Sequence, residues 1–214
     1  MACGKDGKQM NYVICIIVGY LLGSINPAAL ISKIRRINLR KRGTGNLGAT
    51  NTLLTFGKWF FAIVLAFDIA KAFAVVKLAN LIFPENAAIG MVAGGAAIVG
   101  HIWPFYMNFN GGKGLAAFGG LVLAVDPAVF GILLATALIL IVITNHGIAM
   151  PMCAGALFPL LFWLRGGDTP SVIITAAIGV VIILKNLKGL KKAIRGEDVK
   201  VRPFIKRYIL KKEA

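Results

Sequence analysis

Long apolar runs separated by short polar stretches dominate the pattern of the chain. The runs cover residues 12–34, 59–83, 87–106, 115–125, 128–143, 148–164 and 172–184. About 20 apolar residues in a helix cross the hydrocarbon core of a bilayer, which is about 30 Å thick. The run 115–125 would rise only about 16 Å as a helix and cannot cross the core alone. The pattern predicts an all-α polytopic membrane protein with about seven membrane-embedded helical segments.

The composition agrees with a membrane protein. The chain is 58% hydrophobic and 15% charged, whereas soluble domains are about 45–50% apolar and about 25% charged. A net charge of +16 could indicate a nucleic-acid partner. The cations, however, lie between apolar runs, which the positive-inside rule explains. We therefore expect the lipid bilayer, and no nucleic acid, as a partner. The cysteine spacing and the two histidines predict no metal site.

The distribution of Lys and Arg predicts the topology. With seven segments, the stretches 35–58, 107–114, 144–147 and 185–214 share one side and carry 18 Lys and Arg, against three on the other side. The first side is therefore expected to face the cytoplasm, with the N-terminus outside and the C-terminus inside. We expect a membrane bundle over 1–184 with two cytoplasmic glycine-rich loops, 35–58 and 107–114, and a basic cytoplasmic tail over 185–214.

Polar residues inside two of the runs must face other helices. Ser24, Asn26 and Pro27 interrupt the first run, where exposed backbone groups would be costly in lipid. Asp68 and Lys71 lie in the second run at a spacing that places both on one helix face. An intramembrane ionisable pair is a candidate functional site, and a structural pair within the bundle is a comparable alternative.

The first glycine-rich loop has the composition of a phosphate site. Its glycines allow sharp turns and bring backbone N–H groups close to an anion. Short polar side chains and cations stand beside them. The candidate contacts are Arg40, Gly43, Thr44, Gly45, Asn46, Gly48 and Asn51. The alternative is a basic loop that only orients the protein in the membrane, which would not require the glycines, asparagines and threonines.

The second glycine-rich loop repeats this chemistry around Lys113. Backbone N–H groups of Gly111, Gly112 and Gly114 at a helix start, together with an ammonium group, suit a phosphate. The Walker A pattern is absent. A tight turn with a snorkelling lysine is the alternative for this loop taken alone. His101, near the cytoplasmic end of its run, is interpreted as a packed residue, a loop orienter or a general base.

At these residues the chain resembles a known family, the bacterial membrane acyl-phosphate:glycerol-3-phosphate acyltransferases of the PlsY type. Residues 20–24 and 38–51 are similar to the first family motif. Gly100, His101 and Pro104 with residues 110–114 are similar to the second. Asp68 and Lys71 also match the helix between the motifs. The order and spacing of the motifs agree over most of the chain.

The resemblance implies transfer of a fatty acyl group from acyl phosphate to the 1-hydroxyl of sn-glycerol 3-phosphate. The products are lysophosphatidic acid, used in phospholipid biosynthesis, and phosphate. No cofactor or metal is implied. Thr44, Lys113 and His101 are the expected catalytic residues, with Asn46 contacting the phosphate. The resemblance places the protein in the bacterial inner membrane as a multi-pass enzyme whose active site faces the cytoplasm.

The chain departs from the family pattern mainly on the acceptor side. The changed positions are Asn38 for Asp, Thr44 for Ser, Leu54 for Arg, Asn110 for Lys, Gly147 and Met150 for serines, Asn186 for His and Gly189 for Asn. Buried polar contacts are worth about 1–3 kcal/mol each, so other groups must replace those lost. We expect His146, Lys185 and Asn186 on the acceptor side. A paralogue with another acceptor and a non-catalytic or transporter-like protein are the alternatives.

Overall fold

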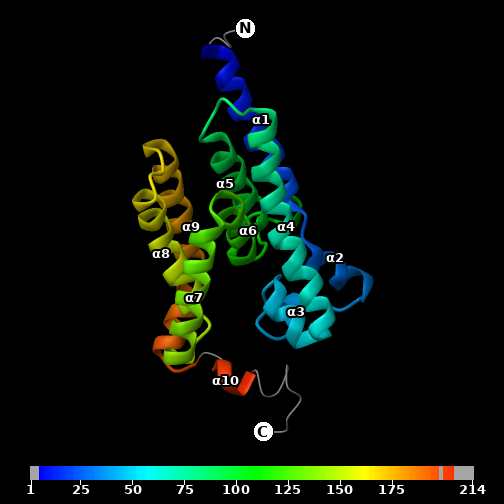
Figure 1. Ribbon diagram of the computed structural model, residues 1–214. Helices are drawn as coiled ribbons and strands as arrows, with labels where there is room; N and C mark the ends of the chain where they lie inside the picture. The colour runs from blue at the N-terminus through cyan, green and yellow to red at the C-terminus, as the bar shows by residue number, and fades with distance from the viewer. Residues whose placement is uncertain (1–4, 198–199, 205–214) are drawn as a thin grey trace.

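The computed structural model describes residues 5–197 and 200–204 as a bundle of helices (Figure 1). In that part of the chain, the only β-type pairing is one isolated bridge between His146 and Lys200. The elements are α1 Lys5–Ser24, α2 Pro27–Ile34, η1 Leu39–Lys41, α3 Ala49–Phe56, α4 Lys58–Ile82, α5 Ile89–Ile102, η2 Phe105–Met107, α6 Leu115–Val125, α7 Pro127–Thr144, α8 Ala149–Leu164, α9 Thr169–Ile194 and α10 Val201–Phe204.

Five stretches of the described chain are long and apolar enough to cross a membrane, and the apolar helices α6 and α8 are shorter. This confirms the predicted helical membrane fold. One stretch differs from the prediction. The stretch 35–58 is not a plain loop, because it contains η1 and α3. Helix α9 extends beyond the apolar run 172–184 to Ile194, and Gly196 with a φ of +73° follows its end.

The helices run in alternating directions, as the seven-segment prediction requires. At the end of the bundle that holds the N-terminus, the Tyr12 hydroxyl donates to Asn86 at 2.7 Å. At the same end Arg165 Nε lies 2.5 Å from the Asp126 carboxylate. At the opposite end, the Val201 amide donates to the carbonyl of Asn145 at 3.0 Å. These contacts join connections that the charge count assigns to the same side of the membrane.

Close backbone contact holds α1 against α5. A Cβ added to Gly23 would lie 2.0 Å from the carbonyl oxygen of Ala97, and one added to Gly100 would lie 2.1 Å from that of Tyr20. Small residues at such crossings let helices associate in lipid, where the hydrophobic effect does not drive them together. The two helices are therefore held in one register, with the C-terminal end of α1 beside the C-terminal end of α5.

The break between α1 and α2 is stabilised from inside the bundle. Ser24 and Asn26 are 1% and 4% exposed, which confirms that these polar residues face inward. The Asn26 side chain accepts a hydrogen bond from the Ala29 amide at 2.8 Å and so caps α2. Its amide nitrogen donates to the carbonyl of Leu47 at 3.2 Å. The break is thereby tied to the first glycine-rich loop.

The short helix α6 occupies the centre of the bundle (Figure 1). Its Phe118 packs edge to face on Phe158 of α8, with ring centroids 5.4 Å apart. On its other side, a Cβ at Gly120 would lie 2.1 Å from the carbonyl oxygen of Ile69 in α4. Because α6 is packed on both sides, the loop that precedes it is held in the middle of the molecule.

Candidate functional site

The first glycine-rich loop is shaped by one buried side chain. Asn51 is fully buried, accepts a hydrogen bond from the Thr44 amide at 2.8 Å and donates to the carbonyl of Leu39 at 2.8 Å. Gly43 and Gly45 have φ values of +51° and +72°, which favour glycine. Asn51 therefore shapes the loop from within, which differs from the phosphate contact that the sequence predicts for it.

The loop presents both cations and short polar side chains outward. Lys41, Arg42, Thr44 and Thr50 are exposed, and Asn46 is half-buried. Gly48 is buried at the N-cap of α3, so that α3 begins directly behind the loop. Leu54 packs beneath the loop, since its Cδ1 lies 3.2 Å from the position of a Cβ at Gly43. Among the glycines of this loop, the hydroxyl of Thr44 and the amide of Asn46 are side-chain groups that a ligand can reach.

The second glycine-rich loop is bonded to the end of α5. The Gly111 amide donates to the carbonyl of Ile102 at 2.9 Å, and the Gly112 amide donates to the carbonyl of His101 at 3.0 Å. Gly114, with a φ of +85°, starts α6. Lys113 lies between these anchored glycines with an exposed side chain. The predicted turn with a lysine at a helix start is therefore present, but the Gly111 and Gly112 amides donate to the end of α5, which differs from the phosphate contact that the sequence predicts for them.

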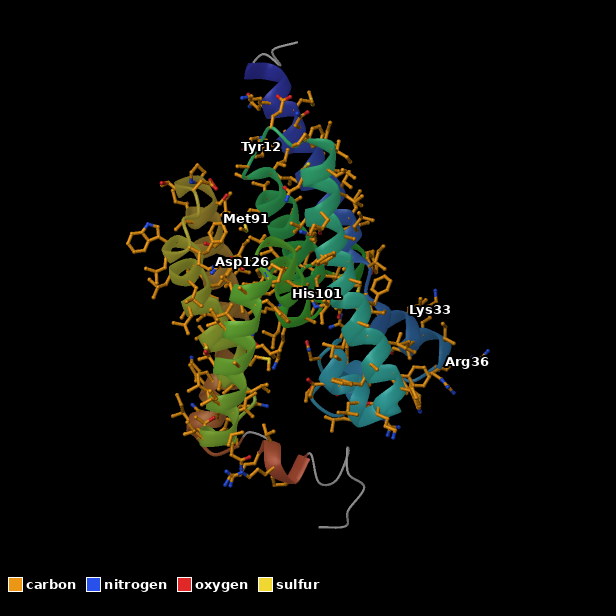
Figure 2. The ribbon with its side chains drawn as sticks, in the orientation of Figure 1. Tyr12, Lys33, Arg36, Met91, His101 and Asp126 are labelled. Carbon is orange, nitrogen blue, oxygen red and sulfur yellow. The ribbon has the colours of Figure 1, made fainter. Side chains whose placement is uncertain are left out.

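A buried ionic cluster lies beneath this loop. Lys71 Nζ is 2.7 Å from the Asp68 carboxylate, as the spacing in the sequence predicts, and donates to the carbonyl of Ile25 at 2.7 Å. His101 Nδ1 lies 3.0 Å from Lys71 Nζ and 3.3 Å from Asp68 Oδ1. The three side chains are 2–8% exposed, and Figure 2 shows His101 in the interior of the bundle. The cluster joins α4, α5 and the break after α1.

His101 also contacts the glycine loop through its ring. A Cβ at Gly112 would lie 2.1 Å from His101 Nε2. The ring is therefore held between the ionic cluster on one side and the loop on the other. Of the roles that the sequence left open, this geometry favours a packed residue that orients the loop.

The two glycine-rich loops meet directly. The Arg40 guanidinium donates a hydrogen bond to the carbonyl of Asn110. These residues are 70 positions apart in the chain, and each adjoins its own loop. The contact brings the cation of the first loop beside the loop that carries Lys113, as the topology predicts.

Helix α9 covers the second loop from the side. Asn186 is 3% exposed, and its amide donates to the carbonyl of Ile182 at 2.9 Å and, more weakly, to that of Lys113 at 3.4 Å. Lys185 Nζ lies 5.3 Å from the centre of the Trp103 ring, a cation–π contact. Gly189 lies near Lys113, whose Nζ is 3.8 Å from the position of a Cβ there. Lys185 and Asn186 therefore adjoin the loops.

His146 lies in a different setting from the other predicted site residues. It follows α7, and its backbone pairs with that of Lys200 ahead of α10. The neighbouring Ile148 reaches α9, where its Cδ1 is 3.0 Å from the position of a Cβ at Gly189. His146 is thus joined to the site region through α9 and the segment before α10.

Three residues that build the site are not among the catalytic and binding residues expected from the sequence. The spacing of Asp68 and Lys71 predicts an ion pair, either functional or structural. Tyr20 belongs to the first family motif without an assigned role, and its hydroxyl donates to the carbonyl of Trp103 at 2.7 Å. The spacing of Asp68 and Lys71 was a usable signal, whereas the Tyr20 contact joins residues 83 positions apart and leaves no trace in local sequence.

The fold and these loops define a multi-pass membrane protein with two cationic glycine-rich loops joined at one face. The family model described as glycerol-3-phosphate acyltransferase matches residues 13–196. The glycerol-3-phosphate acyltransferase of Shewanella halifaxensis is 35% identical over 190 residues, covering 88% of this chain and 94% of that protein. That of Thermoanaerobacter pseudethanolicus is 32% identical over 193 residues, with 90% and 96% covered.

Solved structures agree with this relationship. The crystal structure of PlsY (YgiH), an integral membrane glycerol 3-phosphate acyltransferase, in its glycerol 3-phosphate form has a TM-score of 0.83 and 28% identity, covering 88% of this chain and 94% of that one. Its lysophosphatidic acid form gives a TM-score of 0.81 with 26% identity. The chain belongs to the glycerol-3-phosphate acyltransferase family and is a multi-pass membrane acyltransferase.

Proposed function

We propose that this enzyme transfers a fatty acyl group from acyl phosphate to the 1-hydroxyl of sn-glycerol 3-phosphate. The products are lysophosphatidic acid, for phospholipid synthesis, and inorganic phosphate. The observation that carries the proposal is the junction of the two loops through Arg40 and Asn110. Both substrates contain phosphate, and cationic glycine-rich loops suit that group.

The chemistry needs little from the protein beyond placement. The acceptor hydroxyl oxygen attacks the acyl carbonyl carbon, and the bond from that carbon to the phosphate oxygen breaks. The hydroxyl proton passes to the released phosphate or to water. Acyl phosphate is an activated anhydride, so positioning and stabilisation of the developing oxyanion are the main contributions. We assign these contacts to the Thr44 hydroxyl, the Asn46 amide and the Lys113 ammonium.

His101 acts in this proposal by orienting the second loop. Its carbonyl accepts from the Gly112 amide at 3.0 Å, and its ring is fixed by Lys71 and Asp68. The adjacent Lys113 is thereby held where an anion can reach it. The other ring nitrogen of His101, Nε2, lies against Gly112 within the fold, so the proposal gives the ring a positioning role.

An apolar groove between α1 and α5 is our candidate for the acyl chain. It has a volume of about 410 Å³ and is lined by apolar side chains that include Ile17, Leu21 and Val99. Tyr20 also lines the groove, and its hydroxyl donates a hydrogen bond to the carbonyl of Trp103, just after the end of α5. An acyl chain in this groove would have its carboxyl end near the glycine-rich loops. Filling the groove with Leu21→Trp is expected to shift the preference toward shorter acyl chains.

On the acceptor side we propose Lys185 as the main phosphate contact. It lies on α9 beside Trp103, close enough to Arg40 and Lys188 for their charges to interact. Asn186 is engaged with backbone carbonyls and is expected to support the loop. His146 would contribute to the acceptor side through the segment that it shares with Lys200.

We further propose that the loops face the cytoplasm of a bacterium, in its inner membrane. The support is the bias of 18 Lys and Arg against three between the two sides. A cysteine introduced at Lys188 should react with an impermeant maleimide only in inverted membrane vesicles. Labelling in right-side-out cells would reverse the orientation.

The reaction is tested with purified protein, palmitoyl phosphate and glycerol 3-phosphate. Phosphate release and lysophosphatidic acid formation are both measured, and both should require the acceptor. Lys113→Ala should abolish turnover while the melting temperature is kept, and Lys58→Ala, an exposed lysine outside the loops' junction, should not affect turnover. Turnover only with another acceptor would indicate a divergent paralogue. Absence of any reaction with acyl phosphate would contradict the proposed donor.

A further inference from the structure

A second cationic cavity opens beside α2, away from Lys113. It has a volume of about 510 Å³. One wall is formed by Ala29, Ser32 and Lys33 of α2 together with Arg36 and Ile37, which follow its end. The opposite wall includes Leu47 and Met107. Figure 2 shows Lys33 and Arg36 at the outer edge of the molecule, on and just after α2.

The cavity is lined by positive charge and is suited to bind an anion. Three cations line it, namely Lys33, Arg36 and Arg40. Within residues 5–197 and 200–204, no carboxylate forms an ion pair with any of the three. Two guanidinium groups and an ammonium group match the oxygens of a phosphate, which guanidinium can bind in a bidentate manner.

The backbone at Arg36 is unusual for its residue type. Its φ is +54°, in the left-handed region. The Arg36 amide donates to the carbonyl of Lys33 at 3.2 Å, and the Ile37 amide donates to that of Ser32 at 3.1 Å. Glycine is the usual residue at such a helix end, and another residue there lowers stability. Strained positions of this kind are found where a side chain serves a ligand.

The surroundings of the cavity are apolar, which indicates an amphiphilic ligand. Leu30 and Ile34 form the neighbouring stripe of α2 and are 59% and 69% exposed. Beyond the opposite wall, Phe109 is 61% exposed. A short helix with an apolar stripe beside a basic face is typical of a segment that lies in the membrane interface. A free phosphate ion would not use these apolar side chains.

We propose that this cavity binds the phosphate headgroup of an anionic membrane phospholipid. Lys33 and Arg36 contact the phosphate, and the acyl chains lie along Leu30 and Ile34. Arg40 bounds the cavity but donates to Asn110, so it links this site to the glycine-rich loops. The proposal does not depend on the identity of the acyl donor or acceptor.

The test measures lipid binding to the full chain in a neutral detergent. Native mass spectrometry counts bound phosphatidylglycerol and, separately, phosphatidylcholine with the same acyl chains. The variant Lys33→Gln with Arg36→Gln removes two cavity cations. The matched control, Arg35→Gln with Lys58→Gln, removes two nearby cations outside the cavity lining. We expect the first pair to weaken phosphatidylglycerol binding by about tenfold or more, and the control pair by less than about twofold.

A single variant separates binding from folding. Arg36→Gly removes the guanidinium but suits the left-handed backbone, so the melting temperature should stay the same or rise while lipid binding weakens. Unchanged binding in Arg36→Gly, or equal losses in the two double variants, would overturn the proposal. So would equal binding of phosphatidylcholine, or displacement of phosphatidylglycerol by inorganic phosphate at a similar concentration, which would assign the cavity to free phosphate.

Discussion

Replacement of Gly112 by alanine tests how tightly the second loop is held against His101. The new Cβ would lie 2.1 Å from His101 Nε2, whereas ordinary contact begins at 3.4 Å, so the two groups must separate by about 1.3 Å. Gly112 does not have a positive φ, and the effect of the substitution is therefore steric. The ring is 2% exposed and fixed by Lys71 and Asp68. The loop, with Lys113, is expected to move instead.

The magnitude follows from this displacement. Forcing an extra methyl group into a packed site costs roughly 1–3 kcal/mol of stability. A shift of about 1 Å in a catalytic group lowers the rate about hundredfold. Gly112→Ala should therefore remain folded, with a lower melting temperature, and kcat/KM for phosphate release from palmitoyl phosphate should fall about hundredfold.

Gly119→Ala is the matched control, five residues into α6. A Cβ there would meet Phe130 at 3.6 Å, an ordinary contact. Alanine is also the better helix former, so activity should stay within about twofold and the melting temperature should not fall. If Gly112→Ala kept wild-type activity and stability, the ring and the loop would not be held together as described.

Three further substitutions test the supports of the site and the far end of the bundle. Asp68→Asn leaves the Lys71 ammonium buried without its carboxylate and should cost about 3–5 kcal/mol by thermal unfolding in detergent; the double variant with Lys71→Met should recover much of the loss. Asn51→Ala removes two buried hydrogen bonds, each worth about 1–3 kcal/mol. The variant should have a lower turnover and a lower melting temperature. Wild-type values for both quantities would refute this expectation. At Asp126, partial burial raises the pKa, but hydrogen bonds from Arg165 and from backbone amides outweigh it and hold the pKa below its usual value. The stabilisation is thus present above about pH 4 and lost on acidification. Since Arg165 is half exposed, Asp126→Asn should lower stability by less than about 1 kcal/mol at pH 7, and a difference that did not shrink as the pH falls below about 4 would have another origin.

The order of the helices could be predicted from the sequence because hydropathy is a local property. Two features are not local in this sense. Helix α3 is short and flanked by Gly48 and Gly57, which resembles a loop in sequence. The apolar run 172–184 does not define the end of α9, because a helix continues past its apolar residues when the residues that follow are good helix formers.

Within the site, the sequence indicated residue types better than their partners. The spacing of Asp68 and Lys71 predicts their contact, but the third member, His101, is 30 positions from Lys71 on another helix. The role of Asn51 depends on Leu39 being folded back within reach of its side chain. The cavity beside α2 was missed because Arg36, two residues after the end of α2, adopts a conformation that sequence rules assign to glycine. Such features depend on tertiary packing.

The length of α6 sets a mismatch between the middle of the bundle and an ordinary membrane. Its eleven residues rise about 16 Å, roughly half of a hydrocarbon core of about 30 Å. The pair of Asp126 and Arg165 lies at one end of α6 and Lys113 lies at the other. A segment shorter than the hydrocarbon core is accommodated partly by local thinning of the bilayer. Turnover should therefore respond to membrane thickness, which can be varied through the acyl-chain length of the host lipid.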